Sequence, residues 1–307
     1  MSVLTRPQGA NRALIEGEVS SSGLRFDFVN EPVLVKGFRK MVRELEFDVA
    51  EMAVTTYLTA KEHGVAFTAL PIFLVRDFHH GATQVLRKNS GQPAADLAGS
   101  RIGVNRGYTV TTGVWGRAAL AEAGLDLDSV TWVCSGDEHV AAYVPPRNVL
   151  RAPQGATLEA LLLAGELDAV VGAGIKHPEV VSQIADPDDA AADVLRQRGV
   201  FPINHLVVVR DELLAQHTDL ASMLFTEFAN AKRSYLERLR SGPGDCRQDQ
   251  ILARVMQVTG SDPLPYGIEE NRATLEELVE NAMNQHIVRT RPAIEDLFAD
   301  GTRELQG

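Results

Sequence analysis

Charged and imidazole side chains follow directly after an apolar run in the first third of the chain. Residues 67–75 are predicted to form a strand, and Arg76-Asp-Phe-His79-His80 comes next. Side chains at the carboxyl end of a strand in an α/β protein are well placed to face a ligand cleft. The alternative is a surface loop in which an Arg76–Asp77 pair contributes little to stability. Two histidines also raise the question of a metal, but adjacent residues point in different directions and no third ligand follows at a suitable spacing.

A polar turn that contains glycine precedes a predicted helix further along the chain. A strand at residues 101–104 leads into residues 105–113, and the helix is expected over residues 114–122. Backbone N–H groups at a helix start are unpaired and lie at the positive end of the dipole, so this turn could bind an anion. The plainer alternative is helix capping by the threonines and a surface arginine. We expect ligand contacts from these residues of the turn: Asn105, Arg106, Gly107, Tyr108, Thr109, Thr111 and Thr112.

An acidic pair stands beside a histidine after the next predicted strand. The strand covers residues 130–134, and Asp137-Glu138-His139 follows it. A carboxylate beside an imidazole can orient the ring and hold its tautomer, as general acid–base catalysis requires. Otherwise the segment is a polar loop in which Asp137 caps a short helix.

Two more polar residues lie in segments that are otherwise apolar. Glu51 lies where a predicted strand meets its helix, and it is either a base in a cleft or a helix cap whose charge suits the dipole. His205 lies in a predicted strand at residues 203–209. A lone histidine in a strand is more often structural, so His205 is a candidate for binding rather than for chemistry.

Composition limits the classes to which the chain can belong. Of its 307 residues, 45% are hydrophobic and 23% are charged, which is an ordinary globular mixture. The net charge of −11, without a block of Lys and Arg, argues against nucleic-acid binding. No apolar run is long enough to span a membrane, and the first residues lack the pattern of a signal peptide, so we expect no membrane contact and a cytoplasmic location. The two cysteines predict neither a disulfide framework nor a zinc site.

Hydrophobic periodicity predicts short strands that alternate with helices. Strands are expected at residues 24–29, 47–54, 67–75, 101–104, 130–134, 168–172 and 203–209. Helices are expected at residues 34–45, 55–62, 114–122, 157–163, 213–239, 251–258, 275–288 and 294–298. Pro71 argues against a central position for its strand or marks a bulge, and the acidic residues 186–193 are expected to form a solvated loop that leads into a helix. The alternation predicts an α/β fold with a parallel or mixed sheet and a helical C-terminal segment.

Several strings resemble those of known families. FDVAEM at residues 47–52, LAGSRIGV at 97–104, LDAVV at 167–171 and FPINHLVV at 201–208 resemble the type II periplasmic-binding-protein fold. More closely, PIFLVRDFHH at 71–80, GVNRGYTVTTG at 103–113 and SGDEHV at 135–140 are similar to the 4,5-dihydroxyphthalate decarboxylase family. The resemblance covers nearly the whole chain. Where the family carries an Asp-Arg-Thr-Arg-like stretch after the first strand, this chain reads Gly9-Ala-Asn-Arg12, so that Arg12 is the matching contact.

The resemblance implies a fold, an activity and roles for the candidate residues. The fold would have two lobes, one from residues 1–98 and 207–307 and the other from residues 99–206, with the ligand in the cleft between them. The activity would be that of a carbon–carbon lyase that converts 4,5-dihydroxyphthalate to protocatechuate and carbon dioxide, without a cofactor or a metal. The partner would be this small anionic aromatic substrate. We expect acid–base catalysis from His139, His79 and His80 with Glu51 behind them, and substrate contacts from Arg12, Arg76, His205 and residues 105–112.

Two other functions are compatible with the same residues, because a fold does not determine a function. One is a solute-binding or sensing protein that binds a small anion without turnover, although the expected lack of a signal peptide argues against a transport role. The other is a related cytoplasmic enzyme that acts on a different anionic aromatic compound. The helical tail would also be compatible with a homo-oligomer.

Overall fold

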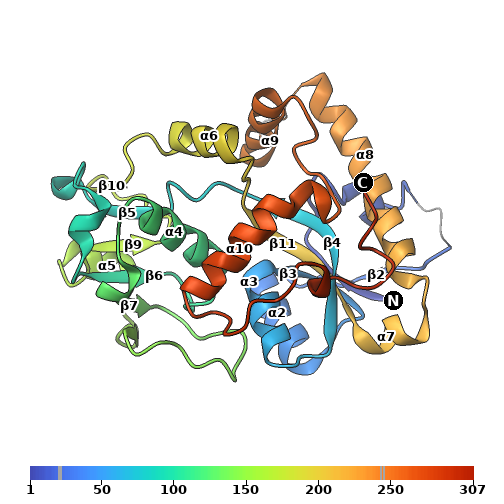
Figure 1. The fold of residues 1–307 in the computed structure, drawn as a ribbon, viewed down its shortest axis with the longest axis horizontal. Coiled ribbons are helices and arrows are strands. Elements are labelled where there is room, and N and C mark those ends of the chain that lie inside the picture. Colours follow the sequence, from blue (N-terminus) through green and yellow to red (C-terminus); the bar gives the residue numbers. More distant parts are fainter. Residues whose placement is uncertain (20–22, 243, 245) are drawn as a thin grey trace.

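Two β-sheets, which lie at opposite ends of the long axis, organise the protein (Figure 1). The computed structural model describes residues 1–19, 23–242, 244 and 246–307. Helix α10 (Arg272–Asn284) runs across the middle of the molecule, between the regions of the two sheets (Figure 1). The mixed α/β class and the helical C-terminal segment predicted from periodicity are therefore confirmed.

The first sheet has the strand order β2-β1-β3-β11-β4. Its strands are β1 (Ser2–Leu4), β2 (Asp27–Phe28), β3 (Val49–Ala53), β4 (Phe67–Arg76) and β11 (Ile203–Arg210). β1 runs parallel to β2 and β3, whereas β11 lies antiparallel between β3 and β4. Alternate residues of β11 join different apolar clusters, Val207 with helix α8 (Leu220–Ser241) and Leu206 with helices α2 (Leu34–Glu44) and α3 (Val54–Glu62). Helices therefore cover both faces, which explains why these strands read as continuous apolar runs.

The second sheet has the order β10-β5-β9-β6-β7-β8. Its strands are β5 (Thr83–Leu86), β6 (Arg101–Val104), β7 (Thr131–Cys134), β8 (Val149–Arg151), β9 (Ala169–Val171) and β10 (Val180–Ser182). β6 is parallel to both of its neighbours, β7 and β9. Helix α4 (Thr111–Glu122) and helix α5 (Leu158–Leu163) supply the crossover segments. The carboxyl ends of β6, β7 and β9 therefore lie at one edge of this sheet, where ligands bind in open α/β sheets.

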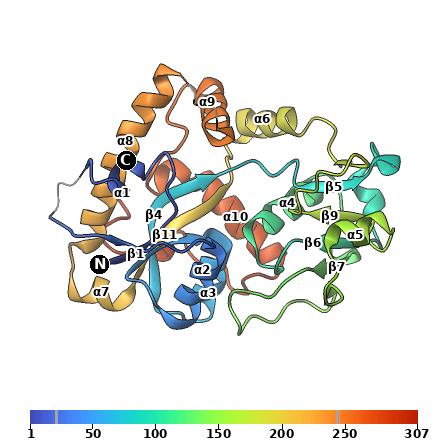
Figure 2. The same cartoon turned by 180° about the vertical axis from the view of Figure 1, so that it is seen from behind.

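The chain crosses between the sheets twice. It leaves the first sheet after β4, enters the second with β5, and returns to the first with β11. The lobe boundaries expected after residues 98 and 206 thus lie downstream of both backbone crossings. Between the lobes, helix α6 (Pro187–Arg198) lies against helix α9 (Arg247–Thr259), where Arg254 Nη2 and Asp189 Oδ1 form an ion pair at 3.0 Å (Figure 2).

Most predicted elements are present, with several corrections to their extent. The strand expected at residues 24–29 shrinks to β2, and the helix expected at 213–239 is divided into α7 (Asp211–Gln216) and α8. The acidic segment 186–193 lies largely inside α6 rather than in a loop, because Pro187 opens that helix and two aspartates in its first turn suit the dipole. Pro71 lies in an edge strand at a register shift, which confirms both expectations for it. In the described part of the chain, no helix combines the length and apolar content needed to cross a bilayer.

Candidate active site

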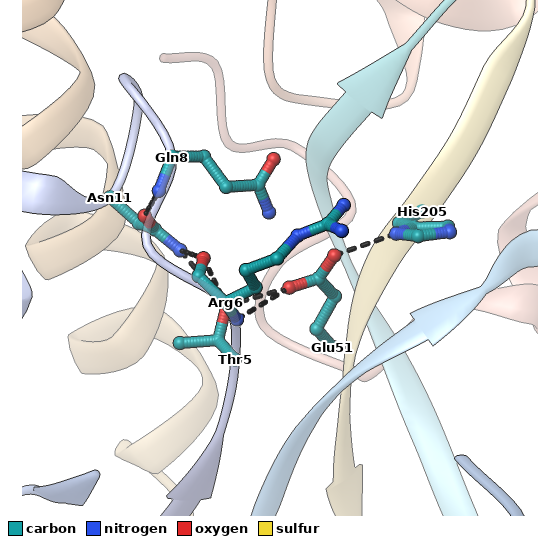
Figure 3. Close-up of polar contacts among 6 residues, drawn as sticks. All are labelled: Thr5, Arg6, Gln8, Asn11, Glu51 and His205. Atoms are coloured by element: carbon teal, nitrogen blue, oxygen red, sulfur yellow. Dashed lines mark hydrogen bonds and ion pairs between the residues drawn. The ribbon is translucent and has the colours of Figure 1, made fainter. Parts of the chain in front are cut away.

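A buried carboxylate and a histidine form a pair at the carboxyl edge of the first sheet (Figure 3). Glu51 lies in β3, and His205 lies diagonally opposite it on the neighbouring strand β11, so that both side chains project from the same face. His205 Nδ1 donates to Glu51 Oε1 at 2.6 Å. Because Nδ1 is engaged in this way, Nε2 is the nitrogen of His205 left to exchange a proton with a substrate.

Glu51 is held in its charged form by donors that converge on it. Its second oxygen, Oε2, accepts hydrogen bonds from Thr5 Oγ1 at 2.8 Å and from the Arg6 backbone N–H at 3.0 Å. Burial alone would raise the pKa of Glu51, but the hydrogen bond and charge of His205, together with the donors from Arg6 and Thr5, outweigh burial and lower it. The pair is thus an imidazole oriented by an ionised carboxylate.

The loop after β1 brings an arginine to this pair. Asn11 fixes the loop, because its Nδ2 donates to Thr5 Oγ1 at 2.9 Å and its Oδ1 accepts from Gln8 N at 2.8 Å. The side chains of Arg6 and Gln8 extend to the side on which the Glu51–His205 pair lies (Figure 3). Gln8 Nε2 is buried and has no hydrogen-bond partner among the described residues.

Arg12, the arginine expected to contact substrate from this lobe, is placed elsewhere. It is the first residue of helix α1 (Arg12–Ile15), it is exposed, and its side chain makes no hydrogen bond or ion pair within the described chain. Arg6 takes the position by the pair, since it lies two residues after the buried end of β1 and its backbone N–H donates to Glu51. The correction arises because β1 has three residues, too few for periodicity to reveal the strand end.

A second histidine, His139, is buried beside helix α2. Its side chain is 2% exposed, and its Nδ1 lies 3.0 Å from Thr56 Oγ1. Its Nε2 is buried with no partner in the described part of the chain. Burial, together with the charges of Arg39, Arg106 and Arg43, lowers the pKa of His139 to about 4.

The carboxylates expected to accompany His139 do not contact it. Asp137 forms an ion pair with Arg151, and Glu138 binds the turn before α4 instead. At neutral pH His139 is therefore an uncharged imidazole among cations rather than a member of an acid–base pair. Side chains of adjacent loop residues point in different directions, so Asp137 and Glu138 do not contact His139 although they are its neighbours in the sequence.

The polar turn before α4 is largely satisfied by the protein itself. The backbone N–H groups of Tyr108 and Thr109 donate to Glu138, and Thr109 Oγ1 donates to it at 2.6 Å. Thr111 Oγ1 lies 2.8 Å from Thr55 Oγ1, and Asn105 Nδ2 donates to the Gly172 carbonyl at 2.9 Å. Of the contacts expected here, those from Tyr108, Thr109, Thr111 and Asn105 are internal to the protein. Gly107 allows the approach of Glu138, and Thr112 lines a cavity.

Arg106 differs from the rest of its turn. Its backbone adopts a left-handed conformation with φ of 70°, held by a hydrogen bond from its N–H to Ser135 Oγ at 2.8 Å. Its half-buried guanidinium has no hydrogen-bond or ion-pair partner among the residues described, and burial together with nearby Arg39 lowers its pKa. Arg39 donates one hydrogen bond to the Asp137 carbonyl but leaves its buried Nε without a partner in the described chain. Two cations without a counter-charge that lie near each other fit an anionic ligand.

Arg76 has a structural role and does not serve as an anchor. It is 3% exposed, donates to the Phe201 carbonyl at 3.2 Å and to Asn271 Oδ1, and packs over the ring of Phe73. Burial lowers the pKa of Arg76 to about 9. Its partners belong to the returning chain and the C-terminal helices, so it joins these segments inside the first lobe.

His79 and His80 share one hollow, near Glu122 and Arg198, but only His79 also lines a larger cavity. His79 Nε2 lies 2.9 Å from Asn204 Oδ1, and this histidine lines the larger cavity, of about 690 Å³, with Thr112, Gly172 and Arg247. Burial lowers the pKa of both histidines. The cavity touches both lobes and both chain crossings, so it is the open part of the cleft. Of the two histidines, His79 alone lines it.

Known relatives cover most of this chain. A 4,5-dihydroxyphthalate decarboxylase of Comamonas testosteroni is 31% identical over 281 residues, which make up 85% of this chain and 84% of the relative. The chain belongs to the 4,5-dihydroxyphthalate decarboxylase family. A second decarboxylase of this name, from Pseudomonas putida, is 33% identical over 201 residues, which cover 60% of this chain and 77% of that one. No family model matches the chain.

This member of the 4,5-dihydroxyphthalate decarboxylase family has the fold that the resemblance implied. The periplasmic aliphatic sulphonate binding protein SsuA from Escherichia coli superposes with a TM-score of 0.54 at 14% identity, over all of this chain and 92% of that one. The fold is therefore of the type II periplasmic-binding-protein kind. Sequence patterns did not reveal Arg6, Gln8 and Arg39, because the first two follow an unrecognised short strand and the third lies in a helix that was predicted from its apolar spacing alone.

Proposed function

We propose that this protein decarboxylates 4,5-dihydroxyphthalate to protocatechuate and carbon dioxide. Family membership supports the reaction, and the observation that carries it is the imidazole of His205, oriented by ionised Glu51 at the same sheet edge as Arg6. A binding protein for an anion needs cations but has no need of an oriented base. The combination of both favours turnover over binding alone.

The substrate supplies the electrons for its own decarboxylation, so the chemistry needs no cofactor. Each carboxylate is para to a ring hydroxyl. His205 Nε2 accepts the phenol proton, and electron density moves to the ring carbon that bears the carboxylate. A proton is added at that carbon, the bond to the carboxylate breaks, and its electron pair returns to the ring as carbon dioxide leaves. Return of the first proton from His205 to the phenolate completes the cycle.

The arginines without counter-charges are the anchors for the two carboxylates. Arg106 and Arg39 approach from the second sheet and helix α2, and Arg6 approaches from the loop after β1. Binding both carboxylates while the phenol faces His205 would fix the ring in one orientation, which is a large part of enzymatic rate enhancement. Gln8, whose buried amide has no partner among the described residues, would donate to the same substrate edge.

His139 is the proposed donor of the proton to carbon. Its pKa of about 4 keeps it neutral in the free protein, and three of the causes are the charges of Arg39, Arg106 and Arg43. A substrate with two negative charges would offset these cations, so its binding would raise the pKa of His139 and allow the ring to take up a proton. Substrate binding would thus prepare the acid that the reaction requires.

The test is turnover of 4,5-dihydroxyphthalate by the purified protein. Protocatechuate should appear in step with loss of the substrate and release of one carbon dioxide, as chromatography and gas analysis would show. Calorimetry would give the affinity in parallel. Tight binding without product would identify a solute-binding protein instead, and neither binding nor product would point to a different anionic aromatic substrate.

A further inference from the structure

A carboxylate of the protein itself binds the turn that precedes helix α4. Glu138 Oε2 accepts from Thr109 N at 3.1 Å and from Thr109 Oγ1 at 2.6 Å, and Oε1 accepts from Tyr108 N. Because the carboxylate is charged, these three hydrogen bonds are charge-assisted. Glu138 therefore occupies the donors that the sequence offered to a substrate anion.

The approach of Glu138 depends on the absence of a side chain at residue 107. A Cβ added to Gly107 would lie 2.6 Å from Glu138 Oε2, far inside contact distance. The glycine is therefore matched to the glutamate, although the two are 31 positions apart in the sequence. This fit indicates a built contact rather than a surface glutamate that happens to rest there.

The residue after Glu138 is His139, and its position is fixed from three elements. Glu138 binds the loop to the turn before α4, Arg43 of α2 donates to the carbonyls of residues 138 and 139 at 3.0 and 3.1 Å, and Thr56 of α3 contacts the imidazole. Arg43 is exposed, and Thr56 makes one contact with the ring. Glu138 makes three charge-assisted hydrogen bonds, so it is the strongest constraint on the backbone that carries His139.

We infer that Glu138 is a positioning residue for this reaction, which binds the turn before α4 and thereby holds His139 in place and keeps substrate carboxylates away from those donors. Substrate anions are then left to Arg106 of the same turn and to Arg39 of helix α2. The inference rests on the proposed function, because His139 matters for turnover only if it delivers the proton. Its geometric part, the link between Glu138 and the His139 ring, can be measured without turnover.

The experiment replaces Glu138 and returns the missing group from solution. Glu138→Ala removes the atoms of an acetate ion, so added acetate can fill the donors of Tyr108 and Thr109. We expect kcat to fall about 100-fold, as misplacement of a reacting group by about an ångström can cost. Acetate should then restore a large part of kcat, whereas acetamide, which has the same shape without the charge, should not. Glu159→Ala is the matched control, since Glu159 is an exposed glutamate in the first turn of helix α5.

A second measurement separates this inference from the proposed function. The ¹⁵N signals of the His139 imidazole should move in Glu138→Ala and return with acetate, whether or not the protein turns over dihydroxyphthalate. A wild-type protein without turnover would refute the proposed function, while this spectral response would still support the positioning role. An unchanged kcat together with unchanged His139 signals in Glu138→Ala would overturn the positioning role. A fall in kcat that acetate does not restore in a folded variant would overturn it as well. If Glu138→Ala does not fold, Glu138→Gln carries the same test, and wild-type kcat and signals in that variant would equally overturn the role.

Discussion

Two histidines lie against the ring of Phe38, and their electrostatic surroundings are opposite. The centroid of Phe38 is 5.3 Å from that of His205 and 6.2 Å from that of His139. His205 has an ionised carboxylate within 2.6 Å, whereas His139 has three arginines around it and an uncharged hydroxyl at Nδ1. The ring of Phe38 thus lies between the Glu51–His205 pair, whose charges balance, and the surroundings of His139, which have an excess of positive charge.

The difference shows which part of the site is prepared in advance and which part depends on substrate. Glu51 and His205 satisfy each other, so the pair keeps its geometry in the free protein. Arg39, Arg106 and His139 lack a negative partner, and two of their buried nitrogens have no hydrogen bond within the described chain. A dianionic substrate would supply the missing charge. In the proposed reaction the first region is therefore the fixed base, and the second would become an acid after substrate binds.

The largest effect is expected at the fixed base. His205→Gln should retain substrate affinity but lose turnover by about 10²–10⁴-fold, because proton transfer is removed while some hydrogen bonding stays. Stopped-flow and steady-state kinetics would measure kcat, and calorimetry would measure affinity. His217→Gln is the control, since His217 is an exposed residue at the end of α7. A His205→Gln variant with normal kcat would remove His205 from the proton transfers of the reaction.

The second prediction concerns stability against pH at His139. A folded-state pKa of about 4, against 6.5 for an ordinary histidine, means that the unfolded chain binds a proton first as the pH falls. The free energy of unfolding should therefore decrease between about pH 6.5 and pH 4, and this residue accounts for roughly 3 kcal/mol of the decrease. Urea denaturation across this range should show a smaller decrease for His139→Gln. His79 and His80 contribute in the same direction to both proteins, so the difference isolates His139. If the free energy of unfolding depended on pH equally in both proteins, the lowered pKa of His139 and the cationic environment that causes it would be contradicted.

Arg106→Ala should have the next effect. Loss of a charge-assisted contact of about 1.5–3 kcal/mol should weaken substrate binding by about tenfold to a hundredfold. Arginine and alanine are both L residues with a Cβ, so the left-handed backbone at position 106 is about equally strained in the wild type and in the variant. Arg12→Ala serves as the matched control and should bind normally, since Arg12 begins helix α1, which packs against helix α8. If Arg12→Ala weakened substrate binding and Arg106→Ala did not, the first-lobe contact to substrate would belong to Arg12.

The smallest expected effect is that of a chelator. Among the described residues no group of three or more His, Cys, Asp and Glu side chains is placed to hold a metal ion. Incubation with EDTA followed by gel filtration is expected to leave kcat unchanged. If EDTA abolished activity and a divalent ion restored it, a metal ion rather than the arginines would neutralise the negative charge of the substrate.

Local pattern predicted the longer strands and most helices, because periodicity reports how each segment is buried, but it missed the short strands β1, β5, β8 and β10. β3, β4, β6, β7 and β11 all lie within a residue or two of their expected limits. The site was predicted less well, because its contacts join residues far apart in the chain. Glu51 and His205 are 154 positions apart, and the sequence alone offered His139 a nearer partner in Asp137. Burial also overturned the role expected of Arg76. It lies at the end of a strand, but its side chain is buried inside the first lobe instead of facing a ligand.

The position of β11 between β3 and β4 sets the order in which the protein can assemble during synthesis. The strands of the second sheet are contiguous, from residue 83 to residue 182, and have all been synthesised before β11 is made. The first sheet has β1 to β4 much earlier, yet β3 and β4 are joined only through a strand that arrives more than 120 residues after them. Until then each presents an unpaired edge, the kind of edge that invites aggregation. The nascent chain therefore acquires its base last, when His205 enters the sheet beside a glutamate synthesised 154 residues before it.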